Sequence, residues 1–448
     1  MERPLFIESL PYTQNSTKLF EYIRGLDHPV WLDSGKPAAS LSRYDVLTAE
    51  PIRVLDSPNY LELNNAQNEL GLLSAQSTAQ LKELELPFVT GVLGFFDYEA
   101  NHREHGLAPS KRSSTALLID QTVVVDHRHQ RTYFCSTKAH PCASLLYKAT
   151  KAYVTEFSEA DKTTTCSLLD SPDTLGLVSD HDQTAFEEKI ETIHEYILAG
   201  DAYQINFSQQ YEGVISSDSY ELYLACREKL AAPYSCFAQL GHKTVLSFSP
   251  ERLVSAQDRR VKTQPIKGTI RRGENDEEDQ ILANELANSD KDRAENVMIV
   301  DLLRNDFSRS CEPHSVEVTR LFELKSFQNV HHLISTIEGT LQQGKSLWEF
   351  FFHCFPGGSI TGAPKRRAME IIAELERRKR GIYCGSIAYQ NIDGRFDSNI
   401  AIRTIEIEGS TVRCAGGAGI TIDSDPTAEY HETLQKIAPL VSVLKGKA

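Results

Sequence analysis

The sequence lacks the features that define several classes of protein. Its nine cysteines include no C-x-x-C pair, so we expect neither a disulfide framework nor a zinc site, and a reducing cytoplasm is the expected compartment. No apolar run approaches the ~18–20 residues that a membrane helix needs. The segment from Met1 to Phe20 has no long apolar stretch, so we expect no signal peptide and no membrane association.

Positive charge is also scarce. The chain carries 47 Lys and Arg against 62 Asp and Glu, which gives a formal net charge of −15. A nucleic acid partner needs a basic face, so this class of function is excluded. A small anionic substrate is compatible with the acidic chain, because a local basic pocket can overrule the global field. The 448 residues are enough for one large core or two domains.

The strongest break in the chain lies between two regions of ordinary globular composition. Residues 159–183 are polar, rich in Ser, Thr and Asp, and poorly periodic, which is typical of a connection. We therefore predict an N-terminal lobe over residues 1–157, a connecting segment over 158–183 and a C-terminal region over 184–448. No internal repeat is visible.

Helical patterns recur in the C-terminal region. Thr184 and Glu187 have the spacing of a capping box before a helix that ends near Gly200. Further helices are predicted over residues 291–306 and 363–380. A last helix follows Ser424, with Pro426 in its first turn.

Strand patterns alternate with these helices. Residues 202–211 predict a strand with one buried apolar face, which includes Tyr203, and one polar face, which includes Gln204. Residues 384–422 predict three strands, with turns at 393–394 and 409–410. Long helices mixed with hairpin-connected strands indicate an α+β fold with large antiparallel sheets.

Three charged residues of the last helix lie on one face. Steps of 3 and 7 residues place Glu429, Glu432 and Lys436 within about 60° of one another. Two carboxylates there could hold Mg²⁺, a cation that prefers oxygen ligands, and the ammonium could pair with a substrate carboxylate. The alternative is a solvated face with an ordinary Glu432–Lys436 pair.

Glu251 and Lys267 form a second candidate constellation. Glu251 follows a strand, and Lys267 comes late enough for a turn and a neighbouring antiparallel strand. The two side chains could then lie on opposite sides of one small molecule. To act as a nucleophile, a lysine must be desolvated or placed near other cations. To act as an acid, Glu251 needs a raised pKa. A solvated strand lysine is the alternative.

Four other features admit both a structural and a functional interpretation. Glu295 lies on a predicted helix, and His332 lies in an apolar strand. Arg403 shares a predicted strand face with Ala401 and Ile405, and could fork onto an anionic carboxylate. The glycine-rich segment PGGSITGAPK fails the Walker pattern, but the helix after it could bind an anion at its N-terminus.

Taken together, these segments resemble the chorismate-utilising family, which includes anthranilate synthases, aminodeoxychorismate synthases, and isochorismate and salicylate synthases. The resemblance is dense from about residue 185 to 440. It rests on the motifs GDAYQIN, SFSPERL, PIKGT, LANSDKDRAENVMIVDLLRND, VHHLISTIEG, FPGGSITGAPKRRAMEII, CGSIAY, IAIRT, AGGAGI and AEYHETLQK. The N-terminal lobe matches more weakly, through SRYDVLTAEP and GVLGFFDYE.

The resemblance implies two large facing antiparallel sheets flanked by helices, with chorismate and Mg²⁺ in a central cleft. It places the metal on Glu295 and Glu432, with Glu429 contributing directly or through water. It places the substrate against Thr269, His332, Tyr389, Arg403, Gly417, Gly419 and Lys436. Cations suit a dianionic substrate, and glycines let backbone N–H groups approach a carboxylate.

Two positions distinguish the members of the family. Members that add water at ring carbon 2 carry a lysine where this chain has Gln204, and anthranilate synthases carry a small residue where it has Lys267. Members that aminate carbon 4 resemble this chain at PIKGT. The resemblance thus implies that Lys267 attacks carbon 2 of chorismate while Glu251 protonates the departing carbon-4 hydroxyl. Ammonia then attacks carbon 4, toward 4-aminobenzoate and folate.

The resemblance also implies a partner and a second pocket. No G-x-C-x-G elbow is present, so ammonia is expected from a separate glutamine amidotransferase subunit in a heterodimer. A tryptophan pocket of the family is matched by Ser34, Leu41, Ser42, Arg43, Tyr44, Pro233, Tyr234 and Ser235. Asp33 departs from the glutamate of feedback-inhibited relatives, which leaves open whether L-tryptophan binds.

Two other functions stay open. The first is anthranilate synthase component I, which aminates carbon 2 and releases pyruvate. The second is a non-catalytic regulator that binds chorismate or tryptophan, which the complete set of expected contacts disfavours.

Overall fold

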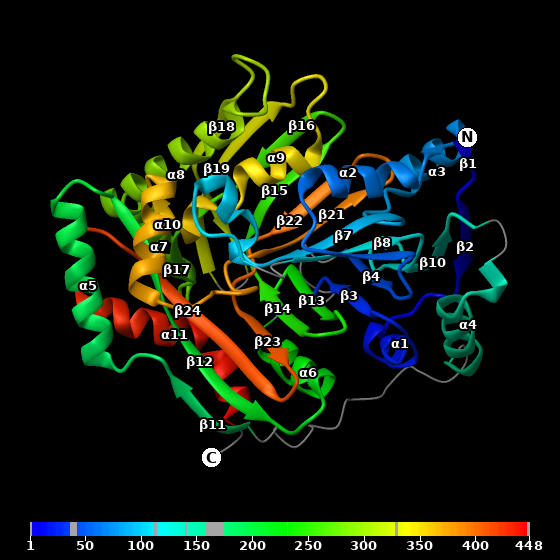
Figure 1. Ribbon diagram of the computed structural model, residues 1–448, viewed down its shortest axis with the longest axis horizontal. Helices are drawn as coiled ribbons and strands as arrows, with labels where there is room; N and C mark the ends of the chain where they lie inside the picture. Colours follow the sequence, from blue (N-terminus) through cyan, green and yellow to red (C-terminus); the bar gives the residue numbers. More distant parts are fainter. Residues whose placement is uncertain are drawn as a thin grey trace.

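The computed structural model describes residues 2–35, 43–110, 114–138, 141–157, 174–230, 232–327 and 330–445. Two large antiparallel sheets face each other, and helices cover their outer faces (Figure 1). The predicted α+β class with two facing sheets is confirmed.

The first sheet has twelve strands among the described residues. In spatial order these are β11 (Thr174–Ser179), β12 (Gln204–Ile215), β24 (Thr411–Ile420), β23 (Thr404–Glu408), β14 (Thr244–Ser249), β13 (Tyr234–Gln239), β3 (Val30–Asp33), β4 (Tyr44–Thr48), β9 (Gln121–Asp126), β10 (Arg131–Ser136) and β2 (Phe6–Leu10), with β20 (Gly362–Ala363) paired to β12.

The second sheet has ten strands in the described part of the chain. Their order is β17 (Ile266–Arg271), β19 (Val330–Thr340), β16 (Arg260–Thr263), β15 (Arg252–Gln257), β22 (Phe396–Asn399), β21 (Ser386–Asn391), β7 (Gly91–Phe96), β8 (Ser114–Ile119) and β5 (Arg53–Asp56), with β18 (Glu317–Ser326) paired to β19. A separate parallel pair joins β1 (Glu2–Arg3) to β6 (Leu72–Leu73).

Two groups of helices cover the sheets. The outer face of the first sheet carries α1 (Ser16–Ile23), α4 (Leu145–Phe157), α5 (Gln183–Leu198), α6 (Ser219–Lys229), α10 (Lys365–Glu376) and α11 (Pro426–Leu444). The second sheet carries α2 (Tyr60–Glu69), α7 (Asp276–Ala287), α8 (Asp290–Ser308) and α9 (Leu347–Cys354). The remaining helices are α3 (Ala75–Leu84), η1 (Tyr98–His105), η2 (Pro141–Ala143) and η3 (Gly358–Ile360).

Apolar side chains fill three main layers. The layer between the sheets includes Leu93 and Phe95 of β7, which pack with Val245 of β14. The layer under α8 and α9 is rich in aromatic rings, such as Trp348 and Phe351 around Phe96. Buried aromatic rings contribute strongly to the energetics of such a core. The third layer lies under α1, α6 and α11.

Strands from both parts of the chain complete each sheet. β13 pairs with β3, and β21 pairs with β7. The consecutive strands β8 and β9 enter different sheets. The division at residues 158–183 stays a prediction, and residues 158–173 of the connecting segment lie outside the described residues.

Some local predictions were wrong. The cap of α5 is Asp182, whose side chain accepts from the N–H of Ala185, so Thr184 lies inside the helix. The strand β12 begins at Gln204, and Tyr203 is 72% exposed beside it. Its polar residues Gln204 and Ser208 are buried, because other elements cover that face as well.

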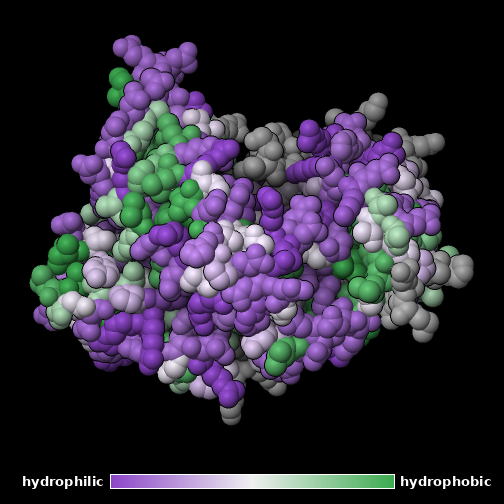
Figure 2. All heavy atoms as spheres, turned by 90° about the horizontal axis from the view of Figure 1, so that it is seen from above, coloured by the Kyte–Doolittle hydropathy of each residue, from purple (hydrophilic) through white to green (hydrophobic). Residues whose placement is uncertain are grey.

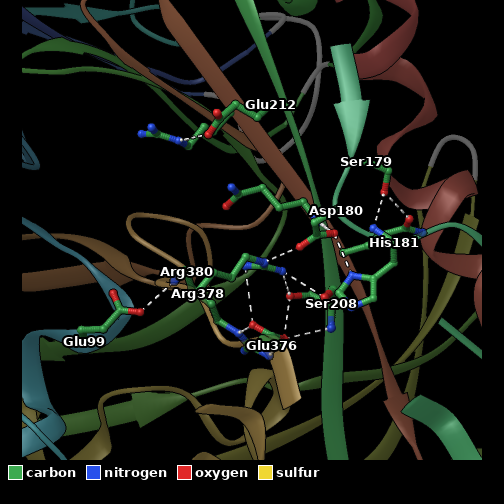
Figure 3. Close-up of polar contacts among 12 residues, drawn as sticks. Glu99, Ser179, Asp180, His181, Ser208, Glu212, Glu376, Arg378 and Arg380 are labelled. Carbon is green, nitrogen blue, oxygen red and sulfur yellow. Dashed lines mark hydrogen bonds and ion pairs between the residues drawn. The ribbon is translucent and has the colours of Figure 1, made fainter. Parts of the chain in front are cut away.

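A buried ionic network ties the first sheet to α10 (Figure 3). The carboxylate of Glu376 accepts hydrogen bonds from the backbone N–H and hydroxyl of Ser208 and from Arg380. Arg378 bonds Asp180 and the carbonyl of Ser208, and the N–H of Arg380 donates to Glu99. Because its members partner one another, the network can lie in the interior.

The face seen from above is mostly hydrophilic, with apolar residues gathered in separate patches (Figure 2). Within the described residues, no helix has the length and apolar character that crossing a membrane requires.

Candidate active site

Lys267 and Glu251 come from strands that are not neighbours. Lys267 lies on β17, and Glu251 immediately precedes β15, with β19 and β16 between these strands. The prediction of neighbouring antiparallel strands was therefore wrong. The two groups are nevertheless close. Burial raises the pKa of the Glu251 carboxyl, and the Lys267 ammonium is the largest influence opposing that rise. A raised pKa is what a glutamate needs in order to donate a proton near neutrality.

A second group of charges surrounds Lys267. Burial raises the pKa of Glu295 on α8, while the charge of Lys267 lowers it and that of Glu432 on α11 raises it. Burial also raises the pKa of Glu429, against the hydrogen bond that Ser424 donates at 2.7 Å. The structure thus brings the three predicted metal ligands within electrostatic reach of one another.

Whether these glutamates can hold Mg²⁺ depends on how many carboxylates the ion needs. Among the described residues, no group of three or more His, Cys, Asp and Glu side chains is arranged to hold a metal ion. Glu432 instead pairs with Lys436 at 2.6 Å, which is the ordinary surface pair that the sequence also allowed. Mg²⁺ typically uses only one or two protein carboxylates together with waters and substrate oxygens. Glu295 and Glu432 would be sufficient.

Cationic and backbone groups of β24 and α11 adjoin this cluster. The Lys436 ammonium donates to the carbonyl of Gly417 at 3.1 Å. A Cβ on Gly419 would stand 2.2 Å from Nε2 of Gln204, so a larger residue there would require the Gln204 side chain to shift. Gln204 itself is fully buried, and both atoms of its amide lack a hydrogen-bond partner. Such a buried unpaired amide is costly.

Thr269, His332 and Arg403 lie together. Thr269 Oγ1 and His332 Nδ1 are 2.7 Å apart across paired strands. Burial lowers the pKa of His332, and the charge of Arg403 lowers it further. The imidazole is therefore neutral near pH 7.

Arg403 departs from its predicted setting. It lies between β22 and β23 with φ 51°, in the left-handed region, so residues 384–422 form four strands rather than three. Burial lowers the pKa of its guanidinium, and no side-chain partner is found for it in the described part of the chain. A partly buried cation without a counterion is suited to an anionic ligand.

Tyr389 is not brought into this group. It packs on Phe88 at 5.1 Å between ring centroids, and its pKa is raised by burial and by the charge of Asp397. Tyr383, which the sequence analysis missed, lies against Gly417. Its hydroxyl lies 3.1 Å from where a Cβ on Gly417 would stand. The only sequence signal is its position near the motif CGSIAY.

Several residues predicted to line a tryptophan pocket lie on or beside β3, β4 and β13. Ser235 pairs with Asp33, and the hydroxyl of Ser34 donates to Asp45 at 2.9 Å. Arg43 stacks on Tyr44 at 4.5 Å and pairs with Glu85 and Asp126. Pro233 and Tyr234 lead into and begin β13. Leu41 and Ser42 lie outside the described residues.

Asp33 is fully occupied by neighbouring groups. Its carboxylate accepts from Tyr223 at 2.8 Å and from Arg227 at 2.5 and 3.1 Å, and also from the N–H of Gly35. This carboxylate is therefore not free to meet a ligand ammonium.

Two pockets differ in their relation to these residues. The larger, of about 550 Å³, is lined by Lys243, Arg380 and Glu406 among others and contains no predicted site residue. The smaller is lined by Glu251, Ser359 and Gly358, among others, and reaches the predicted acid. The smaller pocket, of about 10 Å³, adjoins Glu251 but is too small to hold a substrate. The candidate site is therefore defined by the contacts of its side chains and not by either pocket.

Comparison with known proteins identifies the family of the chain. The sequence profile described as chorismate binding enzyme matches residues 27–442, so the chain belongs to that family.

Its relatives cover nearly the whole chain. It is 35% identical to "Aminodeoxychorismate synthase component 1" of Escherichia coli (strain K12), over 95% of both chains. It is 33% identical to "Anthranilate synthase component 1" of Streptomyces coelicolor, over 99% of this chain and 89% of that one. The crystal structure of anthranilate synthase component I from Streptococcus pneumoniae superposes with a TM-score of 0.73 at 28% identity, covering 89% of this chain and 92% of that one.

Proposed function

We propose that the chain is the chorismate-aminating component of an aminodeoxychorismate synthase. It would convert chorismate to 4-amino-4-deoxychorismate with ammonia and Mg²⁺, for 4-aminobenzoate and folate synthesis. The observation that carries this proposal is Lys267, next to a glutamate whose pKa is raised by burial. Identity of 34–35% over nearly the full length to proteins with this name supports it.

Lys267 can act as the nucleophile and Glu251 as the general acid. The two roles require a proton on the Glu251 carboxyl and a free electron pair on the Lys267 amine. The amine attacks ring carbon 2 as the ring double bonds shift and the carbon–oxygen bond at carbon 4 breaks. Glu251 gives its proton to the departing hydroxyl, which leaves as water. Ammonia then attacks carbon 4, the double bonds shift back, and the bond from carbon 2 to Lys267 breaks.

The remaining residues bind and orient the dianionic substrate. We assign its carboxylates to Arg403, Lys436 and the backbone at Gly417 and Gly419, with Thr269 and His332 beside them and Tyr389 as a more distant contributor. Bound Mg²⁺, held by Glu295 and Glu432 with Glu429 behind them, would neutralise carboxylate charge. Ammonia would come from a glutamine amidotransferase subunit in a heterodimer.

The tryptophan-pocket residues carry a separate proposal. Ser34, Tyr234 and Ser235 around β3 and β13 would bind L-tryptophan, and titration calorimetry with L-tryptophan tests this. The engagement of Asp33 with Arg227 argues for weak binding without feedback inhibition. Absence of heat at millimolar tryptophan would refute the site.

Replacement of Lys267 tests the main proposal. We expect Lys267→Ala to lower formation of the carbon-4 amine by a factor of ~10² or more, with Lys262→Ala of β16 as a matched surface control. Products are separated by chromatography with mass detection. Unchanged amination at carbon 4 in Lys267→Ala would show that Lys267 is not the nucleophile.

A further inference from the structure

The segment that connects α9 to α10 reaches the carboxyl of Glu251. The hydroxyl of Ser359, in η3, donates to Oε1 of Glu251 at 3.1 Å. Among the described residues this is the sole hydrogen bond to that carboxyl. Ser359 belongs to the glycine-rich stretch PGGSITGAPK, to which the proposed function assigns no residue.

Three hydrogen bonds of the backbone hold this segment in place. The hydroxyl of Thr361 donates to the carbonyl of Gly357 at 2.9 Å, and the N–H of Asn206 donates to the carbonyl of Thr361 at 2.8 Å. Arg380 donates to the carbonyl of Ile360 at 2.8 Å. The same guanidinium pairs with Glu376 (Figure 3), so the buried network braces the residue after Ser359.

The segment also packs closely against α8. A Cβ on Gly358 would stand 2.4 Å from Cδ2 of Leu302 on α8. A larger residue there would require the side chain of Leu302 to shift. The residue before Ser359 is thus in close contact with α8.

The other partner of the hydrogen bond is fixed through its backbone. The carbonyl of Glu251 accepts from the N–H of Ile400 at 3.0 Å, and the N–H of Glu251 donates to the hydroxyl of Ser249 at 3.2 Å. With both backbones held, the Ser359 hydroxyl is the group that selects the orientation of the Glu251 carboxyl.

The charged groups near that carboxyl are few. Lys267 of β17 and Lys436 of α11 influence it electrostatically. Arg252, the next residue, is committed to Asp397 by two hydrogen bonds of 2.8 Å. Ser359 is thus the neutral donor in direct contact, and its hydrogen bond opposes the pKa rise caused by burial.

We propose that Ser359 is a positioning residue for the general acid: it holds Oε1 of Glu251, so that Oε2 carries the proton delivered to the departing carbon-4 hydroxyl. The inference rests on the proposed function and extends it. The oxygen–hydrogen bond of the carboxyl breaks as water leaves, and the Ser359 hydroxyl keeps its own proton throughout.

The test compares Ser359→Ala and Ser359→Thr with the unmodified chain. The control is Ser442→Ala, whose exposed hydroxyl donates to the carbonyl of Pro439 on α11 and accepts from Lys229 of α6. Each protein receives chorismate, Mg²⁺ and ammonium chloride over a range of pH. Dividing each rate by that of the unmodified chain at the same pH cancels the titration of ammonia. Thermal unfolding establishes that each variant is folded.

We expect Ser359→Ala to lower kcat by a factor of ~10 or more, with the KM for chorismate within about twofold. The sign of the pH effect follows from the hydrogen bond. A donor to the carboxylate favours its ionised form, so removing the donor raises the pKa of Glu251, and the alkaline limb of kcat moves to higher pH. Ser359→Thr keeps the hydroxyl, so we expect its kcat and the pH of its alkaline limb to match those of the unmodified chain.

Three results would overturn the inference alone: an unchanged kcat in Ser359→Ala, a lower kcat with an unmoved alkaline limb, or a threonine variant no better than alanine. A different result would overturn the proposed function and the inference with it, namely an unmodified chain that does not aminate carbon 4.

Discussion

Lys267 and Glu251 lie close enough for the lysine ammonium to oppose the pKa rise that burial produces in the glutamate carboxyl. Their strands are separated by two others, so this proximity is a property of the folded sheet. A buried acid beside an amine is the arrangement that a displacement with an assisted leaving group requires.

Loss of the acid gives the first prediction. Glu251→Gln removes the proton donor with little change in shape, so kcat is expected to fall by ~10²–10⁴. In the unmodified chain the protonated form is the active one, so the rate falls as pH rises through the raised pKa of Glu251. The variant should show no such limb. Glu338→Gln, which affects a surface pair with Lys262, is the control, and a retained limb in Glu251→Gln would assign it to another group.

Arg403 is expected to strengthen the binding of chorismate without stabilising the free protein. Arg403→Met removes a partly buried cation that lacks a partner among the described residues, so the melting temperature is expected to stay the same or rise. The KM for chorismate is expected to increase by ~10-fold or more, because a charged hydrogen bond contributes ~1.5–3 kcal/mol. Calorimetry and initial rates measure the two effects. A lower melting temperature with unchanged KM would make Arg403 structural.

We expect the rate to depend on Mg²⁺, and this dependence to rest on Glu295 and Glu432. Chelation by EDTA is expected to abolish turnover, and Mg²⁺ to restore it. Glu432→Gln should raise the Mg²⁺ concentration needed for half-maximal rate by ~10-fold or more. The exposed Glu188 of α5 supplies the control, Glu188→Gln. Full activity in EDTA would exclude a metal role for these glutamates.

The buried network should dominate the stability of the first sheet. Glu376→Ala leaves Arg380 buried without its carboxylate, and the free energy of unfolding is expected to fall by ~3–5 kcal/mol. Glu370→Ala, which breaks surface pairs with Arg366 and Arg367 on the same helix, is expected to cost less than ~1 kcal/mol. Urea unfolding compares them. Equal losses would mean that the network contributes little.

The last helix could be predicted closely from the sequence. Side-chain spacing placed Glu429, Glu432 and Lys436 on one face, and Pro426 marked the first turn, as α11 confirms. These signals are local, so they survive in the folded chain. The two facing sheets were inferred from the family resemblance and are also confirmed.

Other features depend on contacts between distant segments. The run from Ile400 to Ile405 has the composition of one strand, but Arg403 adopts φ 51° and interrupts it. Gln204 was expected on a polar face, but other elements bury it completely. The contact of Ser359 with Glu251 spans 108 residues, and no local pattern encodes it.

The most direct test of the account is the product formed from chorismate, Mg²⁺ and an ammonium salt by the purified chain, separated by chromatography with mass detection. The account predicts a product that keeps the enolpyruvyl group and becomes 4-aminobenzoate when the downstream lyase is added. Fluorescent 2-aminobenzoate with released pyruvate would contradict it, and would leave Lys267 without the role proposed for it.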